Sequence, residues 1–361
     1  MADNPQVRFY LGANSPSGFY SLYDQLIDPA QAEDYFLIKG GPGCGKSTLM
    51  RRVGRAMEEH GLEVEYIQCS GDPDSLDAVA IPALRSALVD ATAPHVIEPK
   101  YPGVTGRYLN LGECYDTPAL KEIKDQIIGC MKGYQGCYAR ATRCLSAAAE
   151  IDGDCRSLLL TPAVEEKLAK RARGILSREC RRTGGGPGKA VQRFLDAVTC
   201  QGVLCNFDTA EALCKRIYEL CDTYGLAHTL LTHLAAGAMA AGYDVIVCPD
   251  PMAPERMRHL LIPALSLGFV SSSGELPYTG RRPYRRLRLD PMTDPELLHR
   301  NKARLRFSRK VSAALVGEAV ESMVQAKAMH DKLEALYNPH VDFERVNAIA
   351  DHIAEELLSH L

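Results

Sequence analysis

The chain has 361 residues, of which 46% are hydrophobic and 24% are charged, and its formal net charge is −3. This composition is that of an ordinary globular protein, and the charge gives no global reason to expect nucleic acid as a partner. Because the sequence has neither an apolar run of about 18 residues nor a signal-peptide pattern, we expect a cytoplasmic protein without membrane contact. The chain has thirteen cysteines, an odd number, which argues against a disulfide framework. No Cys-x-x-Cys pair occurs, which argues against a zinc ribbon.

A glycine-rich motif near the start of the chain is flanked by a strand pattern and a helix pattern. Residues 40–47, Gly-Gly-Pro-Gly-Cys-Gly-Lys-Ser, match the phosphate-loop pattern Gly-x-x-x-x-Gly-Lys-Ser at every fixed position. The apolar run 35–38 before them predicts a buried strand, and apolar residues four apart in 48–57 predict a helix. Strand, glycine-rich loop and helix is the order that such a loop requires.

This motif predicts a site for the phosphates of a nucleoside triphosphate together with Mg²⁺. The glycines let backbone N–H groups approach the β-phosphate, and the start of the helix adds a partial positive charge. Lys46 is expected to bind the β- and γ-phosphates, and the Ser47 hydroxyl is expected to coordinate Mg²⁺. The residues expected to bind the nucleotide are Gly40, Gly41, Pro42, Gly43, Cys44, Gly45, Lys46, Ser47 and Thr48.

A second metal ligand is expected at the end of an apolar strand. Residues 86–90 predict such a strand, which ends in Asp90, after a stretch at 75–85 that we interpret as helical. Asp90 would then lie at the carboxyl end of the sheet, where ligands of parallel α/β sheets bind. We therefore expect Lys46 and Asp90 to be the catalytic residues. The acidic stretch 72–77 is the other candidate, and its carboxylates would either orient a water or an acceptor hydroxyl, or begin the next helix.

The motifs that are missing narrow the class of nucleotide-binding protein. Asp90 is followed by Ala91, not by a glutamate that could activate water. The guanine-specificity motif Asn-Lys-x-Asp is absent, which favours ATP, and so is the Leu-Ser-Gly-Gly-Gln signature of transporter-type ATPases. A second glycine-rich stretch, 184–189, lacks the residues of a phosphate loop and is interpreted as a linker.

The chain repeats itself at a period of about 181 residues. The second copy has Leu226, Ala227 and His228 where the first has Gly45, Lys46 and Ser47, and Ser271 where the first has Asp90. One active and one degenerate site are therefore predicted. The expected fold is α/β, with tandem P-loop NTPase-like three-layer α/β/α units, parallel sheets and helical extensions. The expected domains are 1–183 with the active loop, a glycine-rich linker at 184–192, and a degenerate unit at 193–361 with C-terminal helices.

Helical patterns follow each unit, at 118–180 and at 297–337, and a final helix is expected from about residue 342. Two basic stretches lie here, at 167–193 and at 281–310. They are interpreted as solvated helix faces, as a surface for a polyanion, or as the source of an arginine for the γ-phosphate. The candidates for that arginine are Arg281, Arg282, Arg285 and Arg286.

Most of the chain resembles a family of poorly characterised bacterial cytosolic proteins, predicted ATPases with two tandem P-loop-like halves. The residues that carry the likeness are 40–47, 69–77, 90–103, 242–250 and 259–270. The resemblance implies ATP binding and hydrolysis without a known substrate. Members often have a phosphate loop in both halves, from which this chain departs at 226–228. His95 is a candidate to face the γ-phosphate or to be a structural residue of its loop.

The leading hypothesis is an Mg²⁺-dependent, ATP-binding NTPase in which slow hydrolysis or nucleotide occupancy switches the arrangement of the two halves. The alternative is a kinase that transfers the γ-phosphoryl group to a small molecule. Two features favour it: no glutamate follows Asp90, and the strand that ends in Asp90 is expected only one further strand along the chain, as in kinase-type phosphate loops. A third hypothesis, a nucleic-acid-associated ATPase, rests only on the basic stretches. The acceptor and any protein partner are not identified by the sequence.

Overall fold

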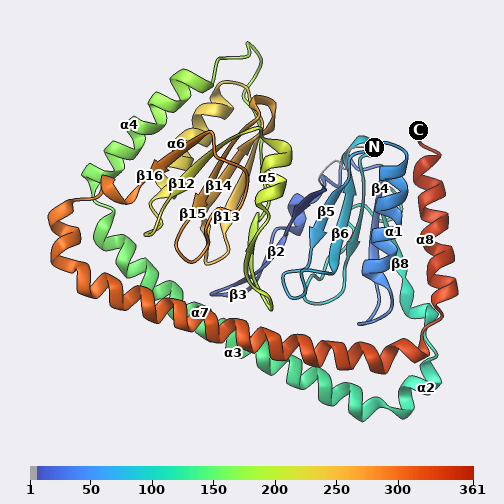
Figure 1. Ribbon diagram of the computed structural model, residues 1–361. Coiled ribbons are helices and arrows are strands. Elements are labelled where there is room, and N and C mark those ends of the chain that lie inside the picture. Colours follow the sequence, from blue (N-terminus) through green and yellow to red (C-terminus); the bar gives the residue numbers. More distant parts are fainter. Residues whose placement is uncertain (1–5) are drawn as a thin grey trace.

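The computed structural model describes residues 6–361, which form two α/β units spanned by two long helices (Figure 1). The first unit contains a six-stranded sheet with the order β1-β5-β6-β7-β4-β8. Its strands are β1 (Val7–Phe9), β4 (Asp34–Lys39), β5 (Glu65–Gln68), β6 (Leu76–Ile81), β7 (Ser86–Asp90) and β8 (Gly106–Asn110). A hairpin of β2 (Gly12–Ser15) and β3 (Gly18–Ser21) lies beside it.

The second unit repeats this topology strand for strand. Its sheet has the order β16-β12-β15-β14-β13-β9, and a second hairpin joins β10 to β11. The strands are β9 (Ala190–Gln192), β10 (Asp196–Thr199), β11 (Gly202–Cys205), β12 (Arg216–Cys221), β13 (Val245–Asp250), β14 (Ala253–Ile262), β15 (Leu267–Ser272) and β16 (Arg285–Arg288). The internal repeat is thus present in the fold, and the end of the expected linker, residues 190–192, forms the edge strand β9.

Two expectations about the sheets are wrong. They are not fully parallel, because β6 runs antiparallel to β5 and β7, and β14 does the same in the second sheet. Residues 75–85 are not helical but form β6 and the 3-10 turn η2 (Pro82–Leu84). All six residues of β6 are buried, so no helical or strand period distinguishes them in the sequence. Arg85, with a φ of 50°, then reverses the chain into β7.

The outer face of each sheet is covered by two helices, one of which comes from the other half of the chain. On the first sheet lie α1 (Lys46–Glu59) and α8 (Phe343–Leu358), which share one apolar core with it. On the second lie α6 (Ala227–Ala240) and α4 (Pro162–Glu179). Because α4 follows the first unit and α8 follows the second, the two halves exchange their covering helices.

The inner faces of the two sheets share a single apolar core. Its buried residues come from both sheets, both hairpins, the 3-10 turn η1 (Tyr23–Gln25) and the short helix α5 (Phe207–Leu213). The expected three-layer arrangement is therefore replaced by helices on the outer faces and a shared core between the sheets. This core fixes the two units against each other.

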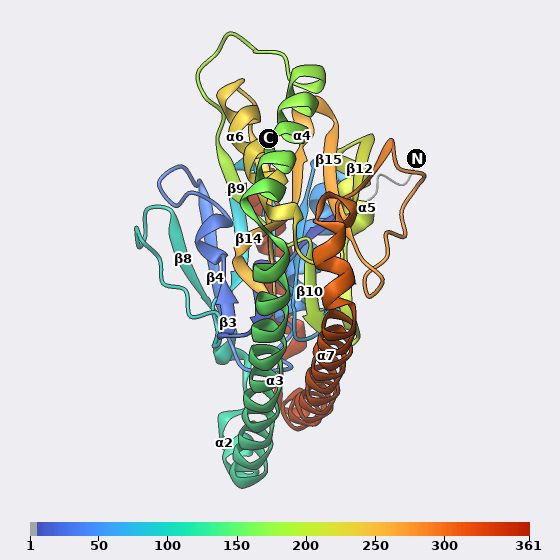
Figure 2. The same cartoon turned by 90° about the vertical axis from the view of Figure 1, so that its left-hand side faces the viewer.

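Two long helices, α3 (Lys124–Leu159) and α7 (Pro295–Tyr337), lie side by side and run in opposite directions across both units (Figures 1 and 2). They pass the edge of the molecule at which β4 and β12 end. The short helix α2 (Thr117–Glu122) precedes α3, and the remaining 3-10 turns are η3 (Leu111–Cys114), η4 (Pro263–Leu265), η5 (Asp290–Met292) and η6 (Asn338–His340). Among the described residues, no helix combines the length and apolar character that crossing a bilayer requires.

Candidate nucleotide site

The glycine-rich loop connects the buried strand β4 to the N-terminus of α1, as the sequence predicts. The strand ends at Lys39 and the helix begins at Lys46. Gly43 and Gly45 have φ values of 69° and 86°, a left-handed conformation that side chains with a Cβ rarely adopt. The two glycines therefore let the chain turn from the strand into the helix within a few residues.

The loop presents a row of free backbone donors. Among the described residues, no protein acceptor is found for the N–H groups of 43–48, and the first amide bonded into α1 is Leu49, which donates to Gly45 O at 2.8 Å. Consecutive free N–H groups at the start of a helix, together with the helix dipole, form a concave site for an anion. This is the feature that a phosphate group requires.

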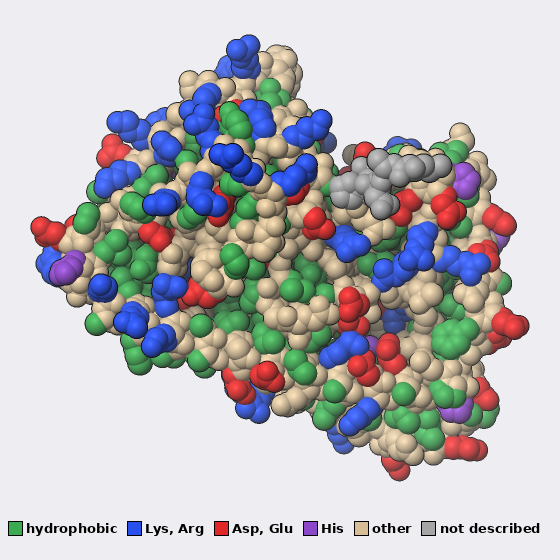
Figure 3. All heavy atoms as spheres, in the orientation of Figure 1, with side chains coloured by type: hydrophobic (Ala, Val, Ile, Leu, Met, Phe, Trp, Pro, Cys, Tyr) green, Lys and Arg blue, Asp and Glu red, His purple; other side chains and the backbone are tan. Residues whose placement is uncertain are grey.

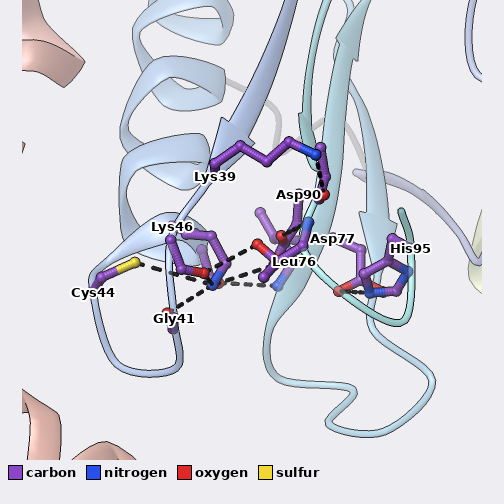
Figure 4. A network of polar contacts seen from close by, with 12 residues as sticks. Lys39, Gly41, Cys44, Lys46, Leu76, Asp77, Asp90 and His95 are labelled. Carbon is purple, nitrogen blue, oxygen red and sulfur yellow. Dashed lines mark hydrogen bonds and ion pairs between the residues drawn. The ribbon is translucent and has the colours of Figure 1, made fainter. Parts of the chain in front are cut away.

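Lys46 and Asp90 come together beside this row, as shown in Figure 4. The Lys46 ammonium donates to Gly40 O at 2.7 Å and to Gly41 O at 2.8 Å, and lies 3.5 Å from Asp90 Oδ2. Their side chains are only 13% and 14% exposed. This proximity arises because β7, which ends in Asp90, pairs directly with β4. Thr92 fixes the carboxylate by donating its N–H to Asp90 Oδ1 at 2.9 Å.

The Ser47 hydroxyl lies at the same end of the loop and bonds to a strand that the sequence did not predict. Its oxygen accepts a hydrogen bond of 2.9 Å from the Leu76 N–H, at the start of β6. A hydroxyl oxygen has a second lone pair, which remains for a metal ion. Ser47 and Asp90 are thus oxygen donors of the type that Mg²⁺ prefers.

The acidic stretch 72–77 does not begin a helix, and its carboxylates have other partners. Asp72 accepts from the Ser75 hydroxyl and lies 3.4 Å from the Lys327 ammonium, and Asp74 accepts from Gln201. Asp77 is buried in β6. These contacts leave Asp90 as the carboxylate beside Lys46.

His95 forms a buried pair with Asp77, with its Nε2 atom 3.5 Å from Asp77 Oδ1 (Figure 4). The Tyr23 hydroxyl donates to the other carboxylate oxygen at 2.8 Å. Although burial opposes both shifts, Asp77 raises the pKa of His95, while His95 and Tyr23 lower the pKa of Asp77. The ring of His95 also packs edge-on against Phe19 and Tyr23. These contacts support the structural interpretation of His95.

Residues from the second half of the chain close over the loop, which the motif alone did not indicate. Gly43 is packed against the last turn of α7, so that a Cβ atom there would lie 3.1 Å from Glu334 Cα. Asn338 donates to Gly43 O at 2.8 Å in the amide orientation that satisfies its neighbours. In the first unit, Tyr115, the residue directly after η3, accepts a 2.7 Å hydrogen bond from the Gly41 N–H. The glycine-rich loop therefore contacts both the first unit and the end of α7.

In the second unit, a carboxylate accepts from the backbone N–H groups at the start of α6. Asp222 directly follows β12, and the sequence period of about 181 residues places it opposite Gly41. Its oxygens accept from the N–H groups of Tyr224, Leu226 and Ala227 at 3.2, 2.9 and 2.7 Å. His228 Nδ1 accepts from the Met257 N–H at 2.9 Å, just as Ser47 accepts from Leu76. The backbone geometry of the repeat is kept, but the donors at the start of α6 are already used.

The two basic stretches converge on the second unit, away from the phosphate loop. A hollow of about 750 Å³ between α4 and β16 is lined by Lys167, Lys170, Arg171, Arg178, Arg285 and Arg286. Figure 3 shows Lys and Arg side chains gathered over this unit. Arg281 pairs with Glu211 at 3.0 Å and Arg286 with Glu219 at 2.6 Å. Arg285 and Arg286 belong to β16, the edge strand of the second sheet, whereas Lys46 begins α1 of the first unit (Figure 1).

Comparisons with protein-family models, with curated proteins and with solved structures found no match for this chain. The functional assignment therefore depends on the geometry of the site.

Proposed function

We propose that this protein binds Mg·ATP at residues 40–48 and hydrolyses it slowly, with one active site per chain. The observation that carries the proposal is the row of free N–H groups from Gly43 to Thr48, next to the Lys46 ammonium and the Asp90 carboxylate. A triphosphate would accept from these amides and from Lys46 in place of the carbonyl groups of Gly40 and Gly41. Ser47 and Asp90 would hold Mg²⁺ between them and the phosphate oxygens.

Slow turnover is expected because the residue after Asp90 has no carboxylate that could act as a general base. Asp90 is followed by the buried Ala91, and the Thr92 hydroxyl donates to Gly40 O at 3.0 Å. Activation of an attacking water by a positioned carboxylate contributes about 10²–10⁴-fold to a rate, and the site would lack that contribution. The contact between Gly43 and α7 gives nucleotide occupancy a direct route to the second unit, as a switch requires.

A single nucleotide per chain is supported by Asp222. Its carboxylate bonds the amides at the start of α6, and a phosphate would have to displace a negative charge that the backbone already stabilises. The second unit also lacks a lysine at the position of Lys46. We therefore propose that this unit does not bind a nucleoside triphosphate.

A small-molecule kinase remains the alternative, supported by the same lack of a general base. We expected the strand of Asp90 only one further strand along the chain, but both β5 and β6 lie between β4 and β7 in the sequence. In the folded sheet, however, β7 is the direct neighbour of β4. In a kinase the acceptor hydroxyl, rather than water, would attack the γ-phosphate.

Titration calorimetry of the full chain with Mg·ATP tests the proposal, followed by turnover assays with and without candidate acceptor metabolites. We expect one ATP per chain, binding that requires Mg²⁺, and preference for ATP over GTP. Phosphate release without an acceptor supports the ATPase, and turnover only with a particular acceptor supports the kinase. Absence of ATP binding, or two ATP molecules per chain, would contradict the proposal.

A further inference from the structure

A cavity of about 290 Å³ lies in the second unit at the place that corresponds to the nucleotide site of the first. Its wall includes Asp222, His228 and Ser271, the counterparts of Gly41, Ser47 and Asp90. Residues of the helices α3 and α7 also line it. The volume is near the lower end of the range for small-molecule sites, so a metabolite-sized ligand fits better than a nucleoside triphosphate.

Two guanidinium groups in this cavity have no carboxylate partner. Arg258 and Arg309, which also line it, pair with Asp250 and Glu275. Within the described chain, neither Arg156 nor Arg256 forms a salt bridge, although both contribute to the cavity wall. An arginine pair without a counter-ion is favourable for a bidentate oxyanion such as carboxylate or phosphate.

The two unpaired arginines converge on Gly225. Arg256 donates to Gly225 O at 2.9 Å, and an Nη atom of Arg156 lies 3.3 Å from the position that a Cβ of Gly225 would occupy. Burial and the positive charge of Arg156 lower the pKa of Arg256, and the nearby carboxylates offset this shift only in part. An anion between the two groups would remove this repulsion.

His228 supplies a third donor. Because its Nδ1 atom accepts from the Met257 N–H, the proton of the neutral ring is on Nε2. Burial and the neighbouring arginines lower the pKa of His228, so the neutral ring is favoured. The cavity thus combines an imidazole N–H donor with two guanidinium groups.

The cavity also contains an acceptor, on the same helix as Arg156. Asp152 lies four residues earlier on α3 and receives a 2.9 Å hydrogen bond from Ser312 of α7. One of its oxygens remains for a ligand hydroxyl or amine. Asp222 is a weaker candidate for this role, since its oxygens already accept from three backbone N–H groups.

We propose that this cavity is a binding site for a small metabolite that carries a carboxylate or phosphate group and a hydroxyl or amine. Arg156, Arg256 and His228 hold the anionic group, and Asp152 accepts from the donor. The degenerate half of the repeat has therefore exchanged a nucleotide site for a metabolite site. Because α7 lines this cavity and also contacts Gly43, the metabolite regulates the first site, a consequence that rests on the proposed function.

Calorimetry with glycerol 3-phosphate and with malate tests the proposal and separates phosphate from carboxylate recognition. Since the phosphate loop also attracts anions, each probe is titrated into the wild type and into Lys46→Ala. We expect saturable binding of at least one probe, retained in Lys46→Ala and weakened roughly 10-fold or more in Arg156→Gln and Arg256→Gln. Arg304→Gln, which removes an exposed partner of Asp154 on the same two helices, is the matched control and should bind normally.

A second experiment uses the wild type and so gives a result even if an arginine variant does not fold. Phenylglyoxal modifies Arg156 with and without the probe, and peptide mass spectrometry measures the modification. Protection by the probe supports the proposal. Binding that survives both arginine substitutions, or no saturable binding of either probe at millimolar concentration, overturns it. Regulation is tested by titrating ATP with and without the saturating probe, and an unchanged ATP affinity overturns that consequence alone.

Discussion

Tyr10 and Phe194 exchange both of their backbone hydrogen bonds, each N–H donating to the other's carbonyl oxygen at 2.9 Å. Each residue lies two positions before the hairpin of its own repeat, so the bridge joins equivalent points of the two halves. Both side chains are fully buried in the core between the sheets. The two halves thus meet at equivalent points at this bridge, and the proposed nucleotide site and the proposed metabolite site lie in corresponding parts of the two halves.

The first prediction concerns the phosphate lysine. Lys46→Ala should weaken Mg·ATP binding about 10- to 100-fold, because it removes a charge-assisted contact worth about 1.5–3 kcal/mol. Titration calorimetry measures the change. Lys100→Ala, which removes an exposed lysine of the same unit, is the control and should bind ATP normally. Equal binding by Lys46→Ala and the wild type would show that the loop is not the nucleotide site.

The second prediction tests the contact between the loop and α7. Gly43→Ala should lower the free energy of unfolding by more than Gly61→Ala, measured by urea denaturation. Both glycines have similar φ values, 69° and 79°, so each substitution costs about 1–2 kcal/mol for the left-handed backbone. At Gly61 a Cβ would meet nothing within 4 Å, whereas at Gly43 it would approach Glu334. Equal losses would mean that α7 does not pack on the loop in solution.

The third prediction concerns the carboxylate at the start of α6 in the second unit. Asp222→Ala should lower the free energy of unfolding by about 1–3 kcal/mol, because the N–H groups of Leu226 and Ala227 lose their acceptor. Thermal or urea denaturation measures this loss. Asp154→Ala, at an exposed ion pair with Arg304, should change it by less than about 1 kcal/mol. If Asp222→Ala and Asp154→Ala had the same free energy of unfolding, Asp222 would not stabilise the start of α6.

The fourth prediction is a pH dependence that arises from His95 and Asp77. The raised pKa of His95 means that its stabilisation is fully present below about pH 6.5 and is lost as the pH rises through the folded-state pKa. The lowered pKa of Asp77 means that its stabilisation is present above about pH 3.9 and is lost as the pH falls. The pair therefore contributes most between these two values.

Urea denaturation at several pH values measures this effect. We expect His95→Gln to destabilise the protein most near pH 6 and progressively less as the pH rises, because the stabilisation by His95 is lost through its raised pKa. His299→Gln, at an exposed histidine of α7, should show no such difference. A destabilisation by His95→Gln that does not change with pH would contradict the charged pair.

Much of the first site could be predicted from the sequence because its chemistry is local. The loop, its strand and its helix are contiguous, and Asp90 ends a short apolar strand that pairs directly with β4. The helix predicted at 75–85 was wrong because six buried residues in a row have no period, and only pairing with β5 and β7 makes them a strand. Asp222 was missed, although the period of the repeat would have placed it opposite Gly41.

The sequence by itself determined the strand, glycine-rich loop and helix, the duplication, and the absence of a second lysine, since each follows from residue identity at a fixed spacing. Only the tertiary structure decided which helix covers which sheet. Both α4 and α8 have one buried apolar side, and the long helices α3 and α7 precede them in the chain and carry it from one unit to the other. The same two helices bring Glu334 and Asn338 to the phosphate loop and Arg156 to the second cavity. These contacts join residues far apart in the chain, and no local pattern specifies them.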